Sequence, residues 1–271
     1  MSAPFVIKLG GALMDSAPAL DAVCRQVAGM HAMQPGSVVV VHGGGKAVDR
    51  QLAALGMPTE RRDGIRITPP EQVLQISGVL SGQVNALLVG SMIAAGARAC
   101  GLRLADAGLA RCSRATHLGF DAGCVGTVTG GDPIALRALL ACGVLPVISS
   151  IGTGESGELL NVNADDAAAA VASILGARGL VFLTDVPGVL DGTRALIPSL
   201  DAPGIERLIT DGTISGGMIP KVRSALETAA ATGVPVTIAG WADPASLTNL
   251  LTGGVAGTRI TAPAPTLTAI P

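Results

Sequence analysis

The chain alternates short runs of β-branched and aliphatic residues with longer stretches in which alanine and leucine recur at helical spacing. This alternation is typical of βαβ units arranged around a mostly parallel sheet. Because both faces of such a sheet are covered, its strands consist of continuous apolar runs. The runs that fit are residues 5–9, 37–42, 144–149, 179–184 and 234–239. We therefore predict an α/β protein with a central, mostly parallel sheet.

Other segments suggest how the chain is divided. An alanine-rich helix is predicted over Asp165–Leu175, and the less regular segment 97–127 is predicted to form strands and a hairpin that project from the sheet. The helix ends before Gly176 and a new strand follows, which favours two lobes, residues 1–177 and 178–271. The Pro/Thr/Ala-rich segment 262–271 is predicted to be a frayed tail.

Composition excludes several classes of protein. Of the 271 residues, 49% are hydrophobic and 14% are charged, which indicates a core-rich globular protein rather than a disordered chain. The net charge of −2, without a basic stripe or a Tyr, gives no basis for binding nucleic acid. Apolar runs are interrupted before reaching the roughly 20 residues that span a bilayer, and no signal peptide precedes the first strand. We expect a cytoplasmic protein.

The five cysteines show no C-x-x-C pair, which argues against both a zinc site and a disulfide framework. We expect them to be small apolar residues of the core, with a catalytic thiol as the minor alternative. No metal site is predicted.

Two glycine-rich turns follow the first two predicted strands. The first is Lys8-Leu9-Gly10-Gly11 and the second is His42-Gly43-Gly44-Gly45. Glycines at the carboxyl ends of strands let backbone N–H groups approach an anion, and ligands of α/β sheets gather at that edge. A simple strand-to-helix turn with a solvated lysine is the alternative for the first motif.

Familiar motifs with similar glycines do not fit. A Walker A loop needs Ser or Thr after its lysine, whereas Ala47 follows Lys46. A hydrolase oxyanion loop requires a G-x-S-x-G nucleophile elbow, and a dinucleotide fold requires G-x-G-x-x-G; the sequence contains neither in the required place. For His42 we favour a buried histidine satisfied by a backbone partner over a catalytic one.

Lysine is rare in this chain. Of the 18 basic residues only Lys8, Lys46 and Lys221 are lysines, and Lys8 and Lys46 lie in the two glycine-rich turns. A compact ammonium fits between transferring oxygens as a point charge, whereas a planar guanidinium demands bidentate geometry. Lysines in these places are thus consistent with a phosphoryl-transfer centre, although chance placement in exposed turns also produces them.

Three further motifs carry polar groups. In Asn161-Val162-Asn163-Ala164-Asp165 the polar residues alternate before a helix, and a plain N-cap would explain Asp165 alone. In the segment 184–190, Asp185 follows a strand and either faces a nucleotide or caps a turn. In the segment 213–221, glycines precede Lys221 at the start of a helix, which is a good place for an anion.

Together these motifs resemble the amino-acid kinase family over Phe5 to about Ile260. The motifs are K-L-G-G, V-H-G-G-G, D-G-I-R-I-T at 63–68, S-S-I-G, N-V-N-A-D, D-V-P-G-V-L-D-G and G-G-M-I-P-K. They are most similar to members that phosphorylate N-acetyl-L-glutamate in arginine biosynthesis. The resemblance implies an open αβα sandwich whose N-terminal lobe binds the acyl amino acid and dimerises, and whose C-terminal lobe binds ATP.

The resemblance also implies roles for individual residues. Lys8 and Lys221 would stabilise the transferring phosphoryl group, and Asp165 would hold both ammonium groups. Arg66 would pair with the α-carboxylate of the substrate. Gly11 and Gly44 would donate backbone N–H groups to phosphate oxygens. The implied substrate-binding residues are Gly44, Gly45, Arg66, Asn161 and Asn163, and the implied ATP-binding residues are Gly10, Gly11, Asp185, Val186, Pro187, Gly188, Val189, Leu190, Thr213, Ile214, Ser215, Gly216, Gly217 and Met218.

The chemistry of that reaction agrees with the motifs. A carboxylate nucleophile is already ionised at neutral pH, so no general base is needed, and the motifs offer no catalytic His or Glu. Phosphoryl transfer asks a protein mainly for positioning and charge neutralisation, with Mg²⁺ carried on the ATP phosphates.

Two departures and two alternatives stay open. Asp63 stands where a basic or amide residue is common, and only four residues precede the first strand, where arginine-inhibited relatives carry a further helix. We therefore predict an arginine-insensitive homodimer. The alternatives are a kinase for a related acylated substrate, such as a carrier-linked aminoadipate, and a catalytically silent metabolite sensor on the same scaffold.

Overall fold

The computed structural model describes residues 3–243 and 246–262. Its main sheet has eight strands in the order β12-β14-β13-β11-β1-β2-β8-β5. All neighbouring pairs are parallel except β13 with β14. These strands are β1 (Phe5–Leu9), β2 (Val38–His42), β5 (Ala99–Arg103), β8 (Leu145–Ser149), β11 (Gly179–Thr184), β12 (Ser199–Leu200), β13 (Val236–Gly240) and β14 (Thr258–Ile260). The predicted central, mostly parallel sheet is confirmed, and all five predicted strands are present.

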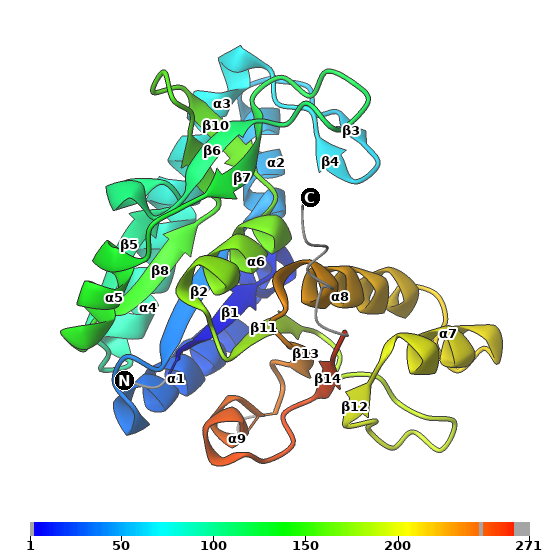
Figure 1. Cartoon of the computed structure of the whole chain (residues 1–271). Helices are drawn as coiled ribbons and strands as arrows, with labels where there is room; N and C mark the ends of the chain where they lie inside the picture. The colour runs from blue at the N-terminus through cyan, green and yellow to red at the C-terminus, as the bar shows by residue number, and fades with distance from the viewer. Residues whose placement is uncertain (1–2, 244–245, 263–271) are drawn as a thin grey trace, which may run out of the picture.

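The helices cover both faces of this sheet, as Figure 1 shows. They are α1 (Ala17–Met33), α2 (Gly45–Ala54), α3 (Pro70–Ser77), α4 (Asn85–Ala94), α5 (Ile134–Ala141), α6 (Ala164–Leu175), α7 (Ala202–Thr210), α8 (Met218–Thr232) and α9 (Ser246–Thr252). Short 3₁₀ turns lie at η1 (Gly11–Asp15) and η3 (Asp106–Gly108), and a π-helical segment, η2 (Gly78–Val84), joins α3 to α4.

Alternation along the strands produces two separate cores. In β1, Val6 packs with residues of α5, α6 and α8, whereas Ile7 packs with residues of α1 and α4 on the other face. Successive side chains of a strand point to opposite faces, so a strand that is apolar throughout requires a helical layer on each side. This three-layer arrangement is the αβα sandwich that the sequence predicted.

A second sheet stands over one end of the first. It has the order β6-β7-β10-β9, with β6 (Arg111–Arg114), β7 (Val125–Gly130), β9 (Ile151–Thr153) and β10 (Leu159–Val162). The prediction for residues 97–127 is right for the antiparallel pair β6 and β7. It is wrong for β5, which is the edge strand of the main sheet, because residues 99–103 pair in parallel with β8.

A two-residue hairpin joins β3 (Arg61–Arg62) to β4 (Ile65–Arg66). Asp63 and Gly64 form its turn with φ angles of 51° and 81°. Positive φ at both central positions favours Asn, Asp and Gly, and the twist of such turns suits a hairpin. Asp63 is therefore a turn residue whose positive φ an aspartate can adopt.

One apolar helix needs separate mention. The continuous segment Pro70–Ala94 is long and apolar enough to cross a membrane, contrary to the sequence-based expectation that no such segment exists. Its side chains Ile76, Leu88 and Met92 nevertheless belong to the core on the α1 face of the sheet. The segment is therefore a core helix of the globular fold.

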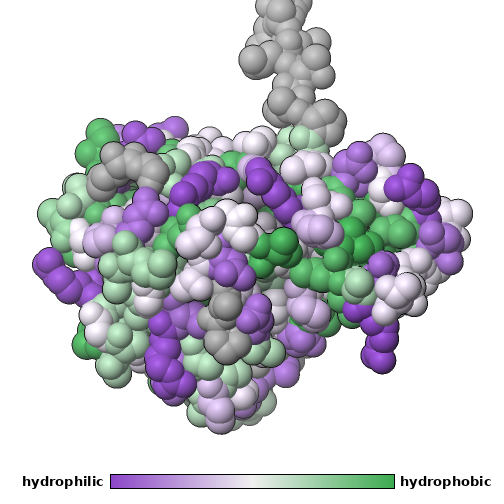
Figure 2. All heavy atoms as spheres, turned by 90° about the horizontal axis from the view of Figure 1, so that it is seen from below, coloured by the Kyte–Doolittle hydropathy of each residue, from purple (hydrophilic) through white to green (hydrophobic). Residues whose placement is uncertain are grey.

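The outer surface carries both hydrophilic and hydrophobic residues. Figure 2 shows the molecule from below, with hydrophilic residues spread over the face and a hydrophobic area on the side of α7 and β12. Of the cysteines, Cys24, Cys112 and Cys124 are buried as expected, whereas Cys142 is exposed. Of the predicted frayed tail, residues 262–271, all but the first residue lie outside the described residues.

A buried polar pair ties β2 to α4. Asn85 Nδ2 donates to His42 Nε2 at 3.0 Å and to the Val147 carbonyl at 2.9 Å. His42 Nδ1 lies 2.9 Å from the Gly43 carbonyl, so its N–H is on Nδ1 and the ring is neutral. Burial lowers the pKa of His42 to about 4, despite the opposing hydrogen bond to Gly43. The preferred interpretation of His42, a buried histidine with a backbone partner, agrees with this geometry.

This pair predicts how stability depends on pH. The pKa of His42 is near 6.5 in the unfolded chain and about 4 in the folded chain. The free energy of unfolding is therefore unaffected by His42 above pH 6.5 and decreases as the pH falls toward 4, because the unfolded chain binds the proton more tightly. The loss is on the order of 3 kcal/mol. Urea unfolding at pH 7 and pH 4.5 should show a larger loss in wild type than in His42→Gln. Equal losses in both proteins would contradict the assignment.

Candidate active site

The carboxyl ends of β1, β2 and β11 meet at the centre of the sheet, where the chain order reverses. From β1 the chain runs to β2, then to the edge strand β5 and back to β8 on one side, and β11 lies on the other side. Ligands of open α/β sheets bind in the crevice at such a reversal. Lys8 and the two glycine-rich turns lie at this edge.

A cavity of about 260 Å³ opens at this edge. Its floor is formed by Lys8 and the glycine turns 10–11 and 43–45, and its sides by β4 and by the start of α6. The predicted residues that line it are Lys8, Gly10, Gly11, Gly44, Gly45, Arg66, Asn161 and Asn163. The structure thus brings together all five predicted substrate-binding residues.

The two glycine turns fit closely against their surroundings. A Cβ on Gly43 would lie 2.9 Å from the Ala164 side chain, and a Cβ on Gly44 would lie 2.9 Å from Leu80 of η2. A Cβ on Gly11 would lie 3.4 Å from the Gly45 nitrogen, which places the two turns in contact. Glycine is therefore required here for close packing as well as for access to the backbone.

Three helix starts at the predicted sites have no side-chain cap. The preceding residues are Gly10 for η1, Gly44 for α2 and Gly217 for α8. Free N–H groups and the helix dipole at such ends attract anions. At α8 the dipole acts without free N–H groups, because the Met218 and Ile219 N–H groups donate to the Ser215 and Gly216 carbonyls. The start of α6 differs, because Asn163 Oδ1 accepts from the Asp165 nitrogen at 2.8 Å. The cap of α6 is Asn163, so the plain N-cap alternative for Asp165 is wrong.

Each of the two lysines is paired with a different carboxylate. Lys8 Nζ lies 2.7 Å from Asp165 Oδ1, and Lys221 Nζ lies 2.9 Å from Asp185 Oδ1. The hydrogen bond from Lys221 lowers the pKa of Asp185 despite slight desolvation. In the structure Asp165 pairs with Lys8, whereas Lys221 lies on the first turn of α8 beside the segment that follows β11 and pairs with Asp185. That Asp165 holds both ammonium groups stays a prediction.

The predicted ATP-binding segments form a separate group. Residues 185–190 and 213–218 do not line the cavity at Lys8. The Val189 N–H donates to Thr258 Oγ1 at 2.8 Å, which fixes the first segment. Ile214 of the second segment is buried, and its N–H donates to the Leu208 carbonyl. Helix α6 packs against both β1 and α8 and so links this group to the cavity.

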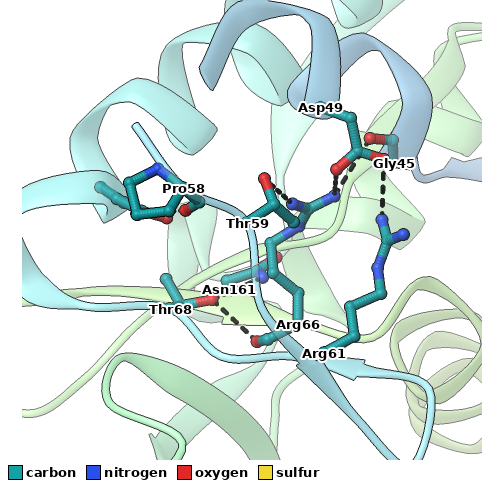
Figure 3. A network of polar contacts seen from close by, with 9 residues as sticks. Gly45, Asp49, Pro58, Thr59, Arg61, Arg66, Thr68 and Asn161 are labelled. Atoms are coloured by element: carbon teal, nitrogen blue, oxygen red, sulfur yellow. Dashed lines mark hydrogen bonds and ion pairs between the residues drawn. The ribbon is translucent and has the colours of Figure 1, made fainter. Parts of the chain in front are cut away.

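A network of two arginines and one carboxylate closes the side of the cavity, as Figure 3 shows. Asp49 of α2 receives Arg66 Nη2 at 2.7 Å and Arg61 Nη2 at 2.9 Å. Arg66 Nη2 also donates to the Gly45 carbonyl at 3.1 Å. Burial pushes the pKa of Asp49 upward, but the hydrogen bonds from Arg66 and Arg61 outweigh it and keep that pKa below its usual value. Asp49 therefore orients both guanidinium groups.

Asn161 is fixed by a chain of hydrogen bonds. Its Nδ2 donates to Thr68 Oγ1 at 3.0 Å, and that hydroxyl donates to the Arg66 carbonyl at 3.1 Å. Strand β10 is in this way tied to β4 across the cavity (Figure 3). The two residues that the resemblance assigned to the substrate, Arg66 and Asn161, are held in position relative to each other.

Four residues of the site were missed from the sequence: Asp49, Arg61, His117 and Asp166. Arg61, His117 and Asp166 line the cavity. Burial, and next the charge of Asp165, raise the pKa of Asp166, while His117 acts against them. Only Arg61 had a usable signal, because Asp63-Gly64 predicts a hairpin and places Arg61 opposite Arg66.

The Asp49 network predicts a difference between two aspartates. Asp49 and Asp15 each bind two cations, but the Arg66 side chain is only 8% exposed, whereas Lys46 and Arg50, the partners of Asp15, are each 64% exposed. Asp49→Ala leaves the buried guanidinium of Arg66 without its carboxylate and should cost about 2 kcal/mol of unfolding free energy. Asp15→Ala should cost less than about 1 kcal/mol. Urea unfolding measures both, and equal costs would contradict the network.

Comparison with known proteins agrees with this geometry. The chain is 44% identical over 256 residues to the acetylglutamate kinase of Aliivibrio fischeri (strain MJ11), covering 94% of this chain and 97% of that protein. The crystal structure of smu.665 from Streptococcus mutans UA159 has a TM-score of 0.74 at 28% identity and covers 96% of this chain and 99% of that chain.

A third similarity concerns the fold alone. The N-acetylglutamate synthase of Neisseria gonorrhoeae, complexed with coenzyme A and N-acetyl-glutamate, has a TM-score of 0.77 at 23% identity. The match covers 97% of this chain and 60% of that chain. Residues 3–240 match the amino acid kinase family as a whole. On the extent of this match and the identity to its relatives, the chain belongs to the amino acid kinase family.

Proposed function

We propose that the chain is an ATP-dependent kinase that transfers the γ-phosphoryl group to the side-chain carboxylate of N-acetyl-L-glutamate, forming an acyl phosphate in arginine biosynthesis. The observation that carries the proposal is the cavity that joins Lys8 and the uncapped glycine turns to Arg66 and Asn161. The near full-length identity to acetylglutamate kinases supports the same substrate.

In this proposal the acyl amino acid lies in the cavity on the N-terminal side. The guanidinium of Arg66, oriented by Asp49, pairs with the α-carboxylate in a charge-assisted hydrogen bond. Asn161 and Asn163 hold the acylated end, and Gly44 and Gly45 approach the substrate through their backbone. The side-chain carboxylate then points toward Lys8.

The phosphoryl group is neutralised by the chain's own charges. Lys8, held by Asp165, and the N–H groups of Gly11 and Gly44 surround the transferring oxygens. Lys221 reaches the same oxygens from α8 after leaving Asp185, and Asp165 then faces both ammonium groups. The carboxylate attacks in its ionised form, so no side chain has to remove a proton.

ATP fits the second group of predicted residues. The positive end of the α8 dipole and Lys221 on its first turn suit its phosphates, and residues 185–190 and 213–218 would surround the nucleotide. Bound ATP supplies the phosphoryl group, and Mg²⁺ would be carried by its phosphates. Among the described residues no three His, Cys, Asp or Glu side chains gather to hold a metal. The proposed lobes are 1–177 for the acyl amino acid and 178–271 for ATP.

The three lysines give a matched test of this mechanism. Lys8→Ala and Lys221→Ala should each lower kcat by about 10²-fold or more while ATP still binds, because preorganised charge is lost from the transition state. Lys46→Ala should keep its activity, since Lys46 is exposed and pairs with Asp15. A hydroxamate assay, which traps acyl phosphates, measures all three. Full activity in Lys8→Ala or Lys221→Ala would overturn the mechanism.

The same assay identifies the substrate. N-acetyl-L-glutamate should give hydroxamate, whereas glutamate and aspartate, which lack the acyl group, should give little. A higher kcat/KM on an acylated aminoadipate would instead favour the alternative substrate.

We further propose a cytoplasmic homodimer whose interface includes the outer face of the Pro70–Ala94 segment. Leu74, Leu87 and Ile93 on this segment are exposed by 66%, 51% and 55%. Large exposed apolar side chains on one helix favour contact with another protein surface. A second copy of the chain would cover them.

This proposal predicts the behaviour of the protein in solution. Sedimentation should give a dimer for wild type and a monomer for Leu87→Glu, because a buried unpaired charge prevents association. Arginine should leave the activity unchanged. A hexamer inhibited by arginine, or an unchanged dimer in Leu87→Glu, would contradict the proposal.

A further inference from the structure

Strand β2 ends in His42, whose imidazole is joined to α4 on the buried side of the glycine turn. Asn85 of α4 donates from Nδ2 to His42 Nε2 at 3.0 Å and to the Val147 carbonyl of β8 at 2.9 Å. A Cβ on Gly101 of β5 would overlap Asn85 Oδ1, so the amide occupies the space that this glycine leaves. Asn85 is therefore held by contacts with three neighbouring strands of the main sheet.

These residues lie behind the cavity at Lys8, but His42 contacts the turn that lines it. Gly43 and Gly44 are among the described residues that line the cavity, whereas His42, Asn85 and Gly101 are not. His42 Nδ1 donates to the Gly43 carbonyl at 2.9 Å. Because His42 Nε2 accepts from Asn85, the one proton of the neutral ring is on Nδ1. Asn85 therefore selects the tautomer of His42 that can donate to Gly43.

The hydrogen bond to the Gly43 carbonyl also orients the next N–H group. The Gly43 carbonyl and the Gly44 N–H belong to one planar trans peptide, in which the two groups point in opposite directions. Glycine on both sides of this peptide restricts its rotation less than any other residue would, so a bond from outside is needed to hold it. Since His42 is fully buried and both glycines line the cavity, the Gly44 N–H is turned away from the core.

We propose that His42 and Asn85 are positioning residues for the phosphoryl transfer: Asn85 holds the Nδ1–H tautomer of His42, and His42 holds the Gly43-Gly44 peptide with its N–H toward the transferring oxygens. This inference rests on the proposed function, in which Gly44 donates to phosphate oxygens. The bond to the carbonyl polarises the peptide and strengthens its N–H as a donor. A donor that is oriented in advance stabilises the transition state without reorganisation, so the effect falls on kcat more than on substrate binding.

Two substitutions of His42 separate its two hydrogen bonds. In His42→Asn the amide nitrogen takes the place of Nδ1 and can donate to the Gly43 carbonyl, but the acceptor for Asn85 is lost. In His42→Gln the amide reaches the place of Nε2 and can accept from Asn85, but the donor to Gly43 is lost. In the hydroxamate assay His42→Gln should lower kcat about tenfold and change both KM values less than about twofold. His42→Asn should keep a kcat closer to that of wild type.

Gly101→Ala tests Asn85 from a position outside the cavity. The added methyl group would displace the Asn85 amide, so Gly101→Ala and Asn85→Ala should each lower kcat several-fold. In the double variant the methyl group enters the space that the amide has left, so kcat should equal that of Asn85→Ala alone. Gly29→Ala is the matched control, because a Cβ on Gly29 of α1 meets open space, and it should keep the kcat of wild type.

Folding and ATP binding of each variant are measured by circular dichroism and by titration with a non-hydrolysable ATP analogue. Long-range hydrogen–nitrogen NMR correlations should show the Nδ1–H tautomer of His42 in wild type. The inference is overturned if the Nε2–H tautomer is found, if folded His42→Gln and Asn85→Ala keep the kcat of wild type, or if His42→Asn loses as much kcat as His42→Gln. A wild type that forms no acyl phosphate would instead contradict the proposed function itself.

Discussion

The ion pair between Lys8 and Asp165 is the contact on which the site depends. It joins the central strand of the sheet to the first turn of α6 at 2.7 Å, with both side chains only partly exposed. The pair can form because Asn163, rather than Asp165, caps the helix and leaves the carboxylate of Asp165 for Lys8. The close contacts of Gly43 with Ala164 and of Gly11 with Gly45 hold the surrounding backbone at the same place.

The positively charged side chains of the candidate active site are each paired with an aspartate. Helix starts without side-chain caps, after Gly10 and Gly44, offer N–H groups, and Lys8 and Lys221 are each paired with an aspartate. The proposed substrate pocket repeats the pattern, since Asp49 holds Arg61 and Arg66. Lys8, Arg61 and Arg66 are thus held in place before a ligand arrives, which lowers the reorganisation that phosphoryl transfer requires.

Much of this fold could be predicted from the sequence, because strands covered on both faces must be apolar throughout and the glycine turns mark their carboxyl ends. The pairs of side chains that meet through the tertiary structure could not be predicted from the sequence. Lys221 and Asp185 are 36 residues apart, and Asp49 lies on an amphipathic helix whose charges all look alike in the sequence. The hairpin at Asp63-Gly64 did carry a local signal, because Asp-Gly is a residue pair that favours the positive φ angles observed at this turn.

The central claim is that fixed charges, and no proton-transferring side chain, carry the proposed reaction. The most direct measurement is the single-turnover rate of acyl phosphate formation from ATP and N-acetyl-L-glutamate across pH 6 to 8, in H₂O and in D₂O. The account predicts a rate that is nearly independent of pH and a solvent isotope effect close to unity, because the carboxylate is already ionised. A rate that rises with the titration of one group, together with a solvent isotope effect of about two or more, would contradict it.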